Sequence, residues 1–235
     1  MTIGLVEIYH LLKSYDYLCQ NNKNMDISRS KNLSNYGWLN AAPMPTHGYL
    51  AEPIRQILLD IHARRVLDLG CGNGALAHWL QNYGFDVTGC DADPEGIQIA
   101  TRGGAGAKFE QVSIYDDPPV CLIERGFDAV VSTEVVEHLF SPRALPQFAS
   151  SVLKAGGYLI VTTPYHGYLK NLMIALTGKW DSHHTPLWDG GHIKFWSRRS
   201  LSSLLNQNGF EIIKFRGAGR ISGFWKSMIL VGRLR

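Results

Sequence analysis

The sequence has few cysteines and no long apolar run, and each shortage excludes a class of protein. Four cysteines occur among 235 residues and none forms a C-x-x-C pair, which disfavours a zinc knuckle and a disulfide framework. No stretch approaches the roughly 20 apolar residues that a membrane-spanning helix needs. The amino-terminal residues also show no signal-peptide pattern, so we expect a cytoplasmic protein with reduced thiols.

Charge of one sign is also scarce. The 23 Lys and Arg residues nearly balance 20 Asp and Glu residues, which gives a formal net charge of +3. Basic residues form no long run or stripe, so nucleic acid is a disfavoured partner. The length suits one α/β domain with extensions, and no internal repeat is present.

The first 47 residues differ from the remainder of the chain. Residues 1–20 space their apolar positions as in an amphipathic helix, and residues 21–47 are rich in Asn, Ser and Pro. We expect residues 1–47 to form an extension or a lid, and residues 48–235 to form the main domain. Whether the first helix packs on the domain or mediates dimer contacts stays open, as does the oligomeric state.

From residue 49 the pattern alternates between helices and strands. Helices are predicted over 49–62, around 76–80, over 142–153 and after Ser197, the last one ended by Gly209. Strands are predicted at 65–69, 86–90, 108–112, 127–132, 158–163, 210–215 and 228–231. This alternation predicts a mostly parallel α/β sheet with helices on both faces. The last two strands have no helix between them, which suits an antiparallel pair at one edge.

A glycine loop lies between the first strand and the helix after it. Gly70, Gly72 and Gly74 allow tight turns and a close approach to a ligand, but their spacing is not the G-x-G-x-x-G of dinucleotide sites. Asp68, just before the loop, would repel a phosphate and suits an ammonium group. Asp91, at the end of the second strand, can accept hydrogen bonds from both hydroxyls of a ribose. A ligand with an amino-acid end and a ribose therefore fits better than NAD.

The run from Val66 to Gly74, followed by Asp91, resembles motif I and its companion acid in class I S-adenosylmethionine-dependent methyltransferases. The resemblance covers roughly residues 50–232 and implies a Rossmann-like, seven-stranded sheet with an antiparallel last strand. It implies that Asp68 and the loop contact the methionine part and that Asp91 holds the ribose. Many relatives carry Asp where Ser113 stands. The cofactor contacts implied are Asp68, Gly70, Cys71, Gly72, Gly74, Asp91, Ala92, Ser113, Ile114 and Thr133.

A second motif, E-x-x-E-H at residues 134–138, follows the fourth strand. Glu134 and Glu137 are three residues apart, so in a helical turn their carboxylates would share one face. The motif resembles the ubiquinone-biosynthesis O-methyltransferases and the small-RNA 3′-terminal 2′-O-methyltransferases, and the latter also have a later histidine in a segment similar to 192–197. This resemblance implies that Glu134, Glu137, His138 and His192 bind Mg²⁺ or Mn²⁺, which would hold vicinal hydroxyls of the acceptor. Similar motifs also occur in methyltransferases without a metal, where the first acid and the histidine line the pocket or cap a helix.

The acceptor side is predicted in residues 1–47 and in an insertion at about 165–195, which is dense in aromatic residues and histidines. Those aromatics suit either a pocket for a flat or apolar acceptor or a packed lid. His166, just after the fifth strand, is the first candidate for a general base, and His138 is a second catalytic candidate. A base is needed only where the acceptor carries a proton to remove.

These features predict an S-adenosylmethionine-dependent methyltransferase, with O-methylation of a small-molecule acceptor as the leading function. A metal-dependent RNA 2′-O-methyltransferase is the alternative within enzymes. A non-catalytic cofactor-binding partner subunit is a third possibility, since such a module could keep the binding residues without transferring a methyl group. The acceptor atom is not fixed by the sequence.

Overall fold

The computed structural model describes residues 37–104, 106–184, 186–188 and 190–235. The helix predicted over residues 1–20 lies outside the described residues. The elements, in chain order, are α2 (His47–Asp60), β1 (Arg65–Leu69), α3 (Ala75–Asn82), β2 (Asp86–Asp91), α4 (Pro94–Arg102), β3 (Lys108–Gln111), α5 (Val120–Arg125), β4 (Phe127–Thr133), the 3₁₀ turn η3 (Val136–His138), α6 (Ala144–Val152), β5 (Leu153–Pro164), α7 (Tyr168–Leu176), α8 (Trp180–His184), α9 (Arg198–Gln207), β6 (Phe210–Ala218) and β7 (Ser227–Leu234).

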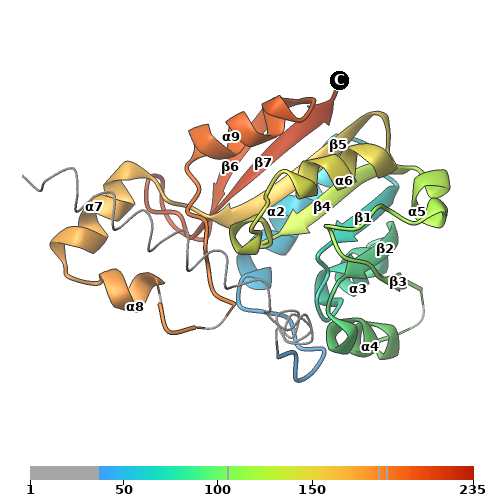
Figure 1. The fold of residues 1–235 in the computed structure, drawn as a ribbon, viewed down its shortest axis with the longest axis horizontal. Helices are drawn as coiled ribbons and strands as arrows, with labels where there is room; N and C mark the ends of the chain where they lie inside the picture. The colour runs from blue at the N-terminus through green and yellow to red at the C-terminus, as the bar shows by residue number, and fades with distance from the viewer. Residues whose placement is uncertain (1–36, 105, 185, 189) are drawn as a thin grey trace, which may run out of the picture. The chain divides into compact units, whose positions relative to one another are not determined.

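The seven strands form one sheet in the order β3-β2-β1-β4-β5-β7-β6 (Figure 1). The five strands from β3 to β5 are parallel to one another, whereas β7 is antiparallel to both β5 and β6. The predicted fold class is therefore confirmed, including the antiparallel last strand. β7 inserts between β5 and β6, so β6 forms the edge of the sheet.

Each face of the sheet is covered by its own helices. Alternate strand residues point to opposite faces, as the two-residue period of a strand requires. On one face Leu67, Val130 and Leu159 pack with apolar residues of α5, α6 and α9. On the other, Val66, Val131 and other strand residues pack with α2 and α3. Figure 1 shows α6 in front of the sheet and α2 behind it. Both faces are buried, which explains the nearly continuous apolar runs of the central strands.

Local signals account for the last helix. Ser197 Oγ accepts a hydrogen bond from the backbone N–H of Ser200, and Ser200 Oγ accepts one from the backbone N–H of Ser197, so the two form a capping box. Gly209 follows the helix at φ +88°, a left-handed conformation that glycine adopts without steric cost. Both ends of this helix therefore lie where the sequence predicts them.

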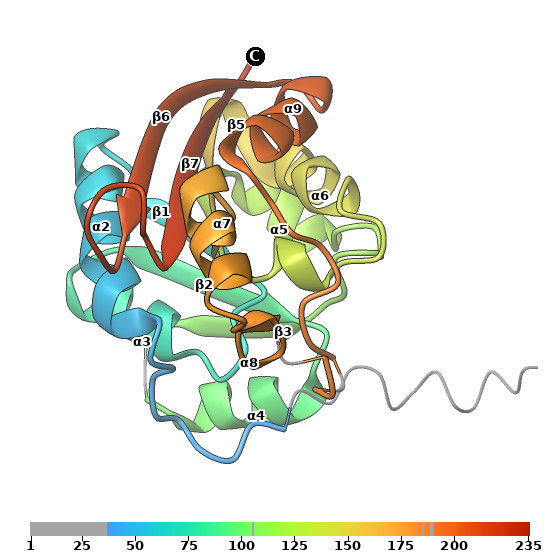
Figure 2. The ribbon, with the colours of Figure 1, turned by 90° about the vertical axis from the view of Figure 1, so that its left-hand side faces the viewer.

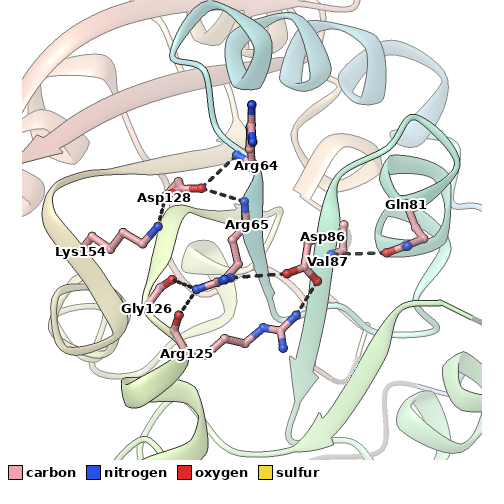
Figure 3. A network of polar contacts seen from close by, with 9 residues as sticks. All are labelled: Arg64, Arg65, Gln81, Asp86, Val87, Arg125, Gly126, Asp128 and Lys154. Carbon is pink, nitrogen blue, oxygen red and sulfur yellow. Dashed lines mark hydrogen bonds and ion pairs between the residues drawn. The ribbon is translucent and has the colours of Figure 1, made fainter.

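The amino-terminal ends of the parallel strands are joined by a polar network (Figure 3). The carboxylate of Asp128 accepts hydrogen bonds from the backbone N–H of Arg65 at 2.8 Å and from Lys154 Nζ at 2.5 Å. The Arg65 guanidinium bonds the Arg125 carbonyl and pairs with Asp86, which also pairs with Arg125. These contacts tie β1, β2, β4 and β5 together at the edge opposite the glycine loop.

No helix among the described residues is long and apolar enough to cross a membrane.

Gly74 and Gly84 both have a left-handed backbone, at φ +76° and +88°. A Cβ atom at Gly74 would lie 2.6 Å from the Ala100 Cβ atom, whereas a Cβ atom at Gly84 would meet nothing within 4 Å. Gly84→Ala should therefore cost only the backbone strain of about 1–2 kcal/mol. Gly74→Ala should cost about 1–3 kcal/mol more from overpacking. Urea unfolding followed by circular dichroism measures both, and equal losses would contradict the packing at Gly74.

Candidate active site

The carboxyl ends of the parallel strands form the edge at which α/β proteins bind ligands. The glycine loop follows β1, Asp91 ends β2, Ser113 and Ile114 follow β3, and the E-x-x-E-H motif follows β4. Segments far apart in the sequence therefore meet at one edge. Helices α7 and α8, which follow β5, extend beyond the same edge (Figures 1 and 2).

The glycine loop turns sharply out of β1 because its three glycines have left-handed φ angles of +81°, +51° and +76°. A Cβ atom at Gly70 would clash with Val135, and one at Gly72 would clash with the Trp38 ring. The backbone N–H groups of Gly70 and Cys71 both bond the Cys90 carbonyl, at 2.8 and 3.1 Å. These contacts pin the loop to the end of β2 and make glycine the only residue that fits without displacement.

Asp68 is 1% exposed, and neither of its carboxylate oxygens has a hydrogen-bond partner among the residues that the structure describes. Burial, together with the nearby charge of Asp91, raises its pKa to about 7. A buried carboxylate without a partner is costly for a fold, so such a group needs an explanation. An ammonium group of a bound ligand would supply the missing partner, in agreement with the role that the sequence predicts.

Asp91 is held in place by the loop itself. Its two carboxylate oxygens accept hydrogen bonds from the backbone N–H groups of Gly72 at 2.8 Å and Asp93 at 2.9 Å. Burial raises its pKa, and these two backbone bonds oppose the rise. The carboxylate therefore has a fixed orientation beside the loop, where further lone pairs can accept ribose hydroxyls.

The remaining predicted cofactor contacts lie around this loop. Ala92 and Thr133 are half-buried at the ends of β2 and β4. Ser113 and Ile114 are also half-buried, and Ser113 Oγ accepts a hydrogen bond from the Tyr115 N–H at 3.1 Å. Cys71 is buried within the loop. All of these residues lie at the carboxyl ends of the parallel strands, but their contacts with a cofactor stay a prediction.

One contact of the glycine loop has no counterpart among the sequence predictions. Asn73 is buried, and its Nδ2 atom donates to the carbonyls of Asn40 at 2.9 Å and Ala42 at 2.8 Å. The Trp38 ring packs against Gly72 and Gly96. The described part of the predicted lid therefore contacts the glycine loop directly. The available signal was Asn73 itself, an amide inside the loop with no predicted role.

The E-x-x-E-H motif brings together only part of the predicted metal set. One ligand atom from each of Glu137, His138 and His192 lies within 4.8 Å of the other two. Glu134 is not in this group. Its carboxylate accepts hydrogen bonds from Thr162 Oγ1 at 2.8 Å and Ser227 Oγ at 3.1 Å. The turn is a short 3₁₀ helix that begins at Val136, and Glu134 has a left-handed φ of +54°, so the two carboxylates do not share one helical face.

Glu137 is the second buried acid of the site. It is 1% exposed, and neither oxygen forms a hydrogen bond within normal distance and angle limits to any described residue. Burial and the charge of Glu134 raise its pKa well above the usual range. His192 Nε2 lies 4.0 Å from Glu137 Oε1, but burial and the neighbouring His138 lower the His192 pKa to about 4, so this pair is not an ion pair at neutral pH.

His138 is oriented by its own backbone contacts. Its Nδ1 atom lies 2.8 Å from the Gly190 carbonyl and 3.2 Å from that of Gly191, so Nδ1 carries the proton and Nε2 carries the lone pair. Burial lowers its pKa. A carbonyl on one ring nitrogen is the usual arrangement behind a metal-binding histidine. The group therefore offers one carboxylate and two neutral imidazoles.

His166, the predicted base, is 9% exposed and begins the segment after β5. Its ring stacks on His184 and makes an edge contact with Phe195. Burial and the charge of Lys170 lower its pKa to about 4, so the ring is neutral at pH 7 but is a weaker base than an ordinary histidine. Its catalytic role stays a prediction.

His166 and His192 line a cavity of about 240 Å³ at this edge. The other polar groups of its wall are His183, His184, Lys170, Arg220 and Lys226. The histidines come from the predicted acceptor insertion at 165–195. The three cations have no counterpart among the sequence predictions: Lys170 is the single charged residue of α7, and the other two lie in the segment between β6 and β7.

The comparison with protein families agrees with this geometry. A family described as "Methyltransferase domain" matches residues 44–214, more than half of the chain. The chain belongs to this family. It is a class I S-adenosylmethionine-dependent methyltransferase, as the sequence predicts.

Individual relatives are more distant. The ubiquinone biosynthesis O-methyltransferase of Burkholderia pseudomallei (strain 1710b) is 24% identical over 200 residues, covering 82% of this chain and 85% of that protein. Magnesium protoporphyrin IX methyltransferase from Synechocystis PCC 6803, solved with bound SAH, has a TM-score of 0.59 at 17% identity, covering 90% of this chain and 95% of that one. The methyltransferase domain of bacterial CtHen1 has a TM-score of 0.59 at 22% identity, covering 79% and 97%. These structural likenesses support the fold.

The pKa of Asp68 predicts how cofactor binding depends on pH. An ammonium partner favours the ionised carboxylate, so binding should weaken as the pH falls below about 7, where Asp68 takes up a proton. The Kd for S-adenosylhomocysteine should rise toward about tenfold per pH unit, measured by calorimetry. Asp68→Asn should raise the Kd about 100-fold at pH 8 and remove this pH dependence, because a buried charge pair is lost.

The matched control is Asp60→Asn, because Asp60 is exposed and pairs with Lys214 Nζ at 2.8 Å. It should bind as tightly as the unaltered protein. Binding that is equally strong at pH 5 and pH 8 would contradict the pairing of Asp68 with the ligand.

Proposed function

We propose that this methyltransferase transfers the methyl group to a hydroxyl of a small molecule that carries two neighbouring hydroxyls, and that Glu137, His138 and His192 hold a divalent cation beside it. The observation that carries the proposal is the buried Glu137 carboxylate: among the described residues it forms no hydrogen bond of normal geometry, and the neutral imidazoles of His138 and His192 lie beside it. A cation would supply the partner that this carboxylate lacks. The curated relatives named as O-methyltransferases support the reaction class.

The donor set favours one kind of ion. Mg²⁺ prefers oxygen ligands in octahedral geometry, whereas Mn²⁺ accepts imidazole and carboxylate together. We therefore expect Mn²⁺ to bind more tightly than Mg²⁺. When bound, the cation would fix the two hydroxyls and lower the pKa of the one that is methylated.

The residues of the chain contribute mainly orientation. In the transfer the acceptor oxygen forms a bond to the methyl carbon while the bond from carbon to the cofactor sulfur breaks, and the hydroxyl proton passes to a base. Alignment of the two reactants supplies much of the acceleration in such a displacement. Thr162 and Ser227 hold the Glu134 carboxylate at the start of the E-x-x-E-H turn, which fixes the following residues. His166 is the base that we propose.

A second candidate function is RNA 2′-O-methylation, and the feature that favours it is His192. The later histidine is the feature that the sequence shares with the small-RNA 2′-O-methyltransferases, and the structure brings His192 within reach of Glu137 and His138. A terminal ribose also presents two neighbouring hydroxyls. The net charge of +3 without a basic stripe favours the small molecule.

The metal site is tested by titrating Mn²⁺ into protein saturated with S-adenosylhomocysteine and recording the free ion by paramagnetic resonance. We expect one ion per chain, and Glu137→Gln should weaken binding by about 100-fold because the single carboxylate of the group is lost. Glu124→Gln, an exposed acid on α5, is the matched control. Glu134→Gln measures whether the fourth predicted ligand takes part.

Folding of Glu137→Gln is checked by its circular dichroism and by its Kd for S-adenosylhomocysteine, which should not change. Equal Mn²⁺ affinity in the unaltered protein and Glu137→Gln would remove the metal from the proposal. Glu137 would then be a buried neutral acid of the pocket wall.

The acceptor class is tested by measuring S-adenosylhomocysteine formation with catechol, phenol and an RNA oligonucleotide. Catechol should react at least about tenfold faster than phenol, because only a diol can engage the cation through both oxygens. EDTA should abolish this difference and Mn²⁺ should restore it. Methylation of the RNA alone would establish the second candidate instead.

A further inference from the structure

The cavity beside the metal group has an unusual wall. Three of its lining side chains, Lys170, Arg220 and Lys226, carry positive charge, and four are histidines. Among the residues that the structure describes, none of the three cations forms an ion pair with a carboxylate. A cavity with three cations and no paired anion lacks the counter-charge that such groups normally have.

Lys170 gives the strongest evidence that the missing group is a ligand. It is 8% exposed, on α7, and its side chain lines the cavity. Burial and the charge of Arg220 lower its pKa to about 8. Glu134 acts in the opposite direction, but its carboxylate oxygens are already bonded to Thr162 and Ser227. A lysine rarely becomes buried unless it is paired, and an anion in the cavity would relieve both effects.

The other two cations approach from a different element. Arg220 and Lys226 are exposed residues of the segment between β6 and β7, and Lys226 Nζ lies 5.2 Å from the centre of the Tyr49 ring. The histidines of the wall add hydrogen-bond donors more than charge, because burial lowers the pKa of His166 and His183 to about 4. The charge that a ligand meets at neutral pH therefore comes from three side chains.

The volume and position define what would fit. A cavity of about 240 Å³ is smaller than the roughly 300–1,000 Å³ of a complete ligand pocket, so it suits one end of an acceptor. His192 belongs both to this cavity and to the group with Glu137 and His138. An acceptor whose hydroxyls lie at that group would therefore extend its other end into the cavity.

We propose that the acceptor is an acid: a small aromatic or aliphatic diol with a carboxylate or a phosphate that binds against Lys170, Arg220 and Lys226. The inference rests on the proposed O-methyltransferase function for the diol, but the anion site itself stands on the cavity alone. Carboxylate and phosphate share the chemistry that this wall recognises, which is a planar or tetrahedral set of anionic oxygens.

The test uses probes without a diol, so that binding does not depend on the metal or on turnover. Benzoate, phenyl phosphate and the neutral benzyl alcohol are titrated by calorimetry into the protein saturated with S-adenosylhomocysteine. Saturation fills the cofactor site beforehand, so the probes cannot bind there. We expect at least one of the two anions to bind about tenfold or more tightly than benzyl alcohol. The tighter of the two identifies the anionic group.

Arg220→Gln and Lys226→Gln remove charge at exposed positions and should each raise the Kd of that anion about three- to tenfold. Arg199→Gln, an exposed cation on α9, should leave it unchanged. Lys170→Met should have the largest effect, and its folding is checked by its Kd for S-adenosylhomocysteine. Anions that bind no better than benzyl alcohol, or equally well in Arg220→Gln and Lys226→Gln, would overturn the proposal.

Turnover separates this proposal from the preceding one. With 3,4-dihydroxybenzoate and catechol as acceptors, the acid should have a KM about tenfold lower, and Arg220→Gln should reduce that preference. Anion binding without methylation of any diol would overturn the proposed function and leave the anion site supported. An RNA oligonucleotide that binds through Arg220 and Lys226, while neither small anion binds, would overturn the acid acceptor.

Discussion

The active site depends on one constraint: two carboxylic acids are buried at the carboxyl ends of the parallel strands. Asp68 and Glu137 are each 1% exposed, and within the part of the chain that the structure describes no oxygen of either accepts a hydrogen bond of normal geometry. Burial destabilises the ionised form of each acid, and the raised pKa of each group reflects this free-energy cost. The rest of the fold has to hold these groups in place until ligands neutralise them.

The fold can do so because the amino-terminal ends of its parallel strands are built differently from their carboxyl ends. At the amino-terminal edge, the carboxylate of Asp128 satisfies the backbone of β1 and binds Lys154, and Arg65 spans to the start of β4 (Figure 3). Exposed ion pairs of this kind contribute little each, but they close the edge. At the carboxyl edge the chain instead turns through glycines. Some polar groups there lack protein partners among the described residues. Strain and unsatisfied polar groups are expected at a ligand-binding site.

This difference explains which features the sequence could predict. Local signals predict the strands, the capped helix after Ser197 and the glycine loop. Hydrophobic periodicity, helix caps and positive φ angles each depend on residues that are close together in the sequence. The metal motif was only partly predictable. Spacing alone suggests that Glu134 and Glu137 share a helical face, but the left-handed φ of Glu134 sends its carboxylate to Thr162 and Ser227 instead. That outcome depends on β5 and β7, which lie far away in the sequence. Lys170, Arg220 and Lys226 escaped prediction for the same reason.

The charges of the site also follow an order along the edge. In the proposed arrangement Asp68 would offer a negative group to the amino end of the cofactor, Glu137 would offer one to a cation, and Lys170 with its neighbours would offer positive charge to the acceptor. Adjacent sites of opposite sign stabilise one another when filled, because a cation at Glu137 and an anion in the cavity would attract across His192. Binding of one should therefore favour binding of the other by the same factor in either order. An acid acceptor would complete this arrangement, whereas a neutral one would leave the cations of the cavity unpaired.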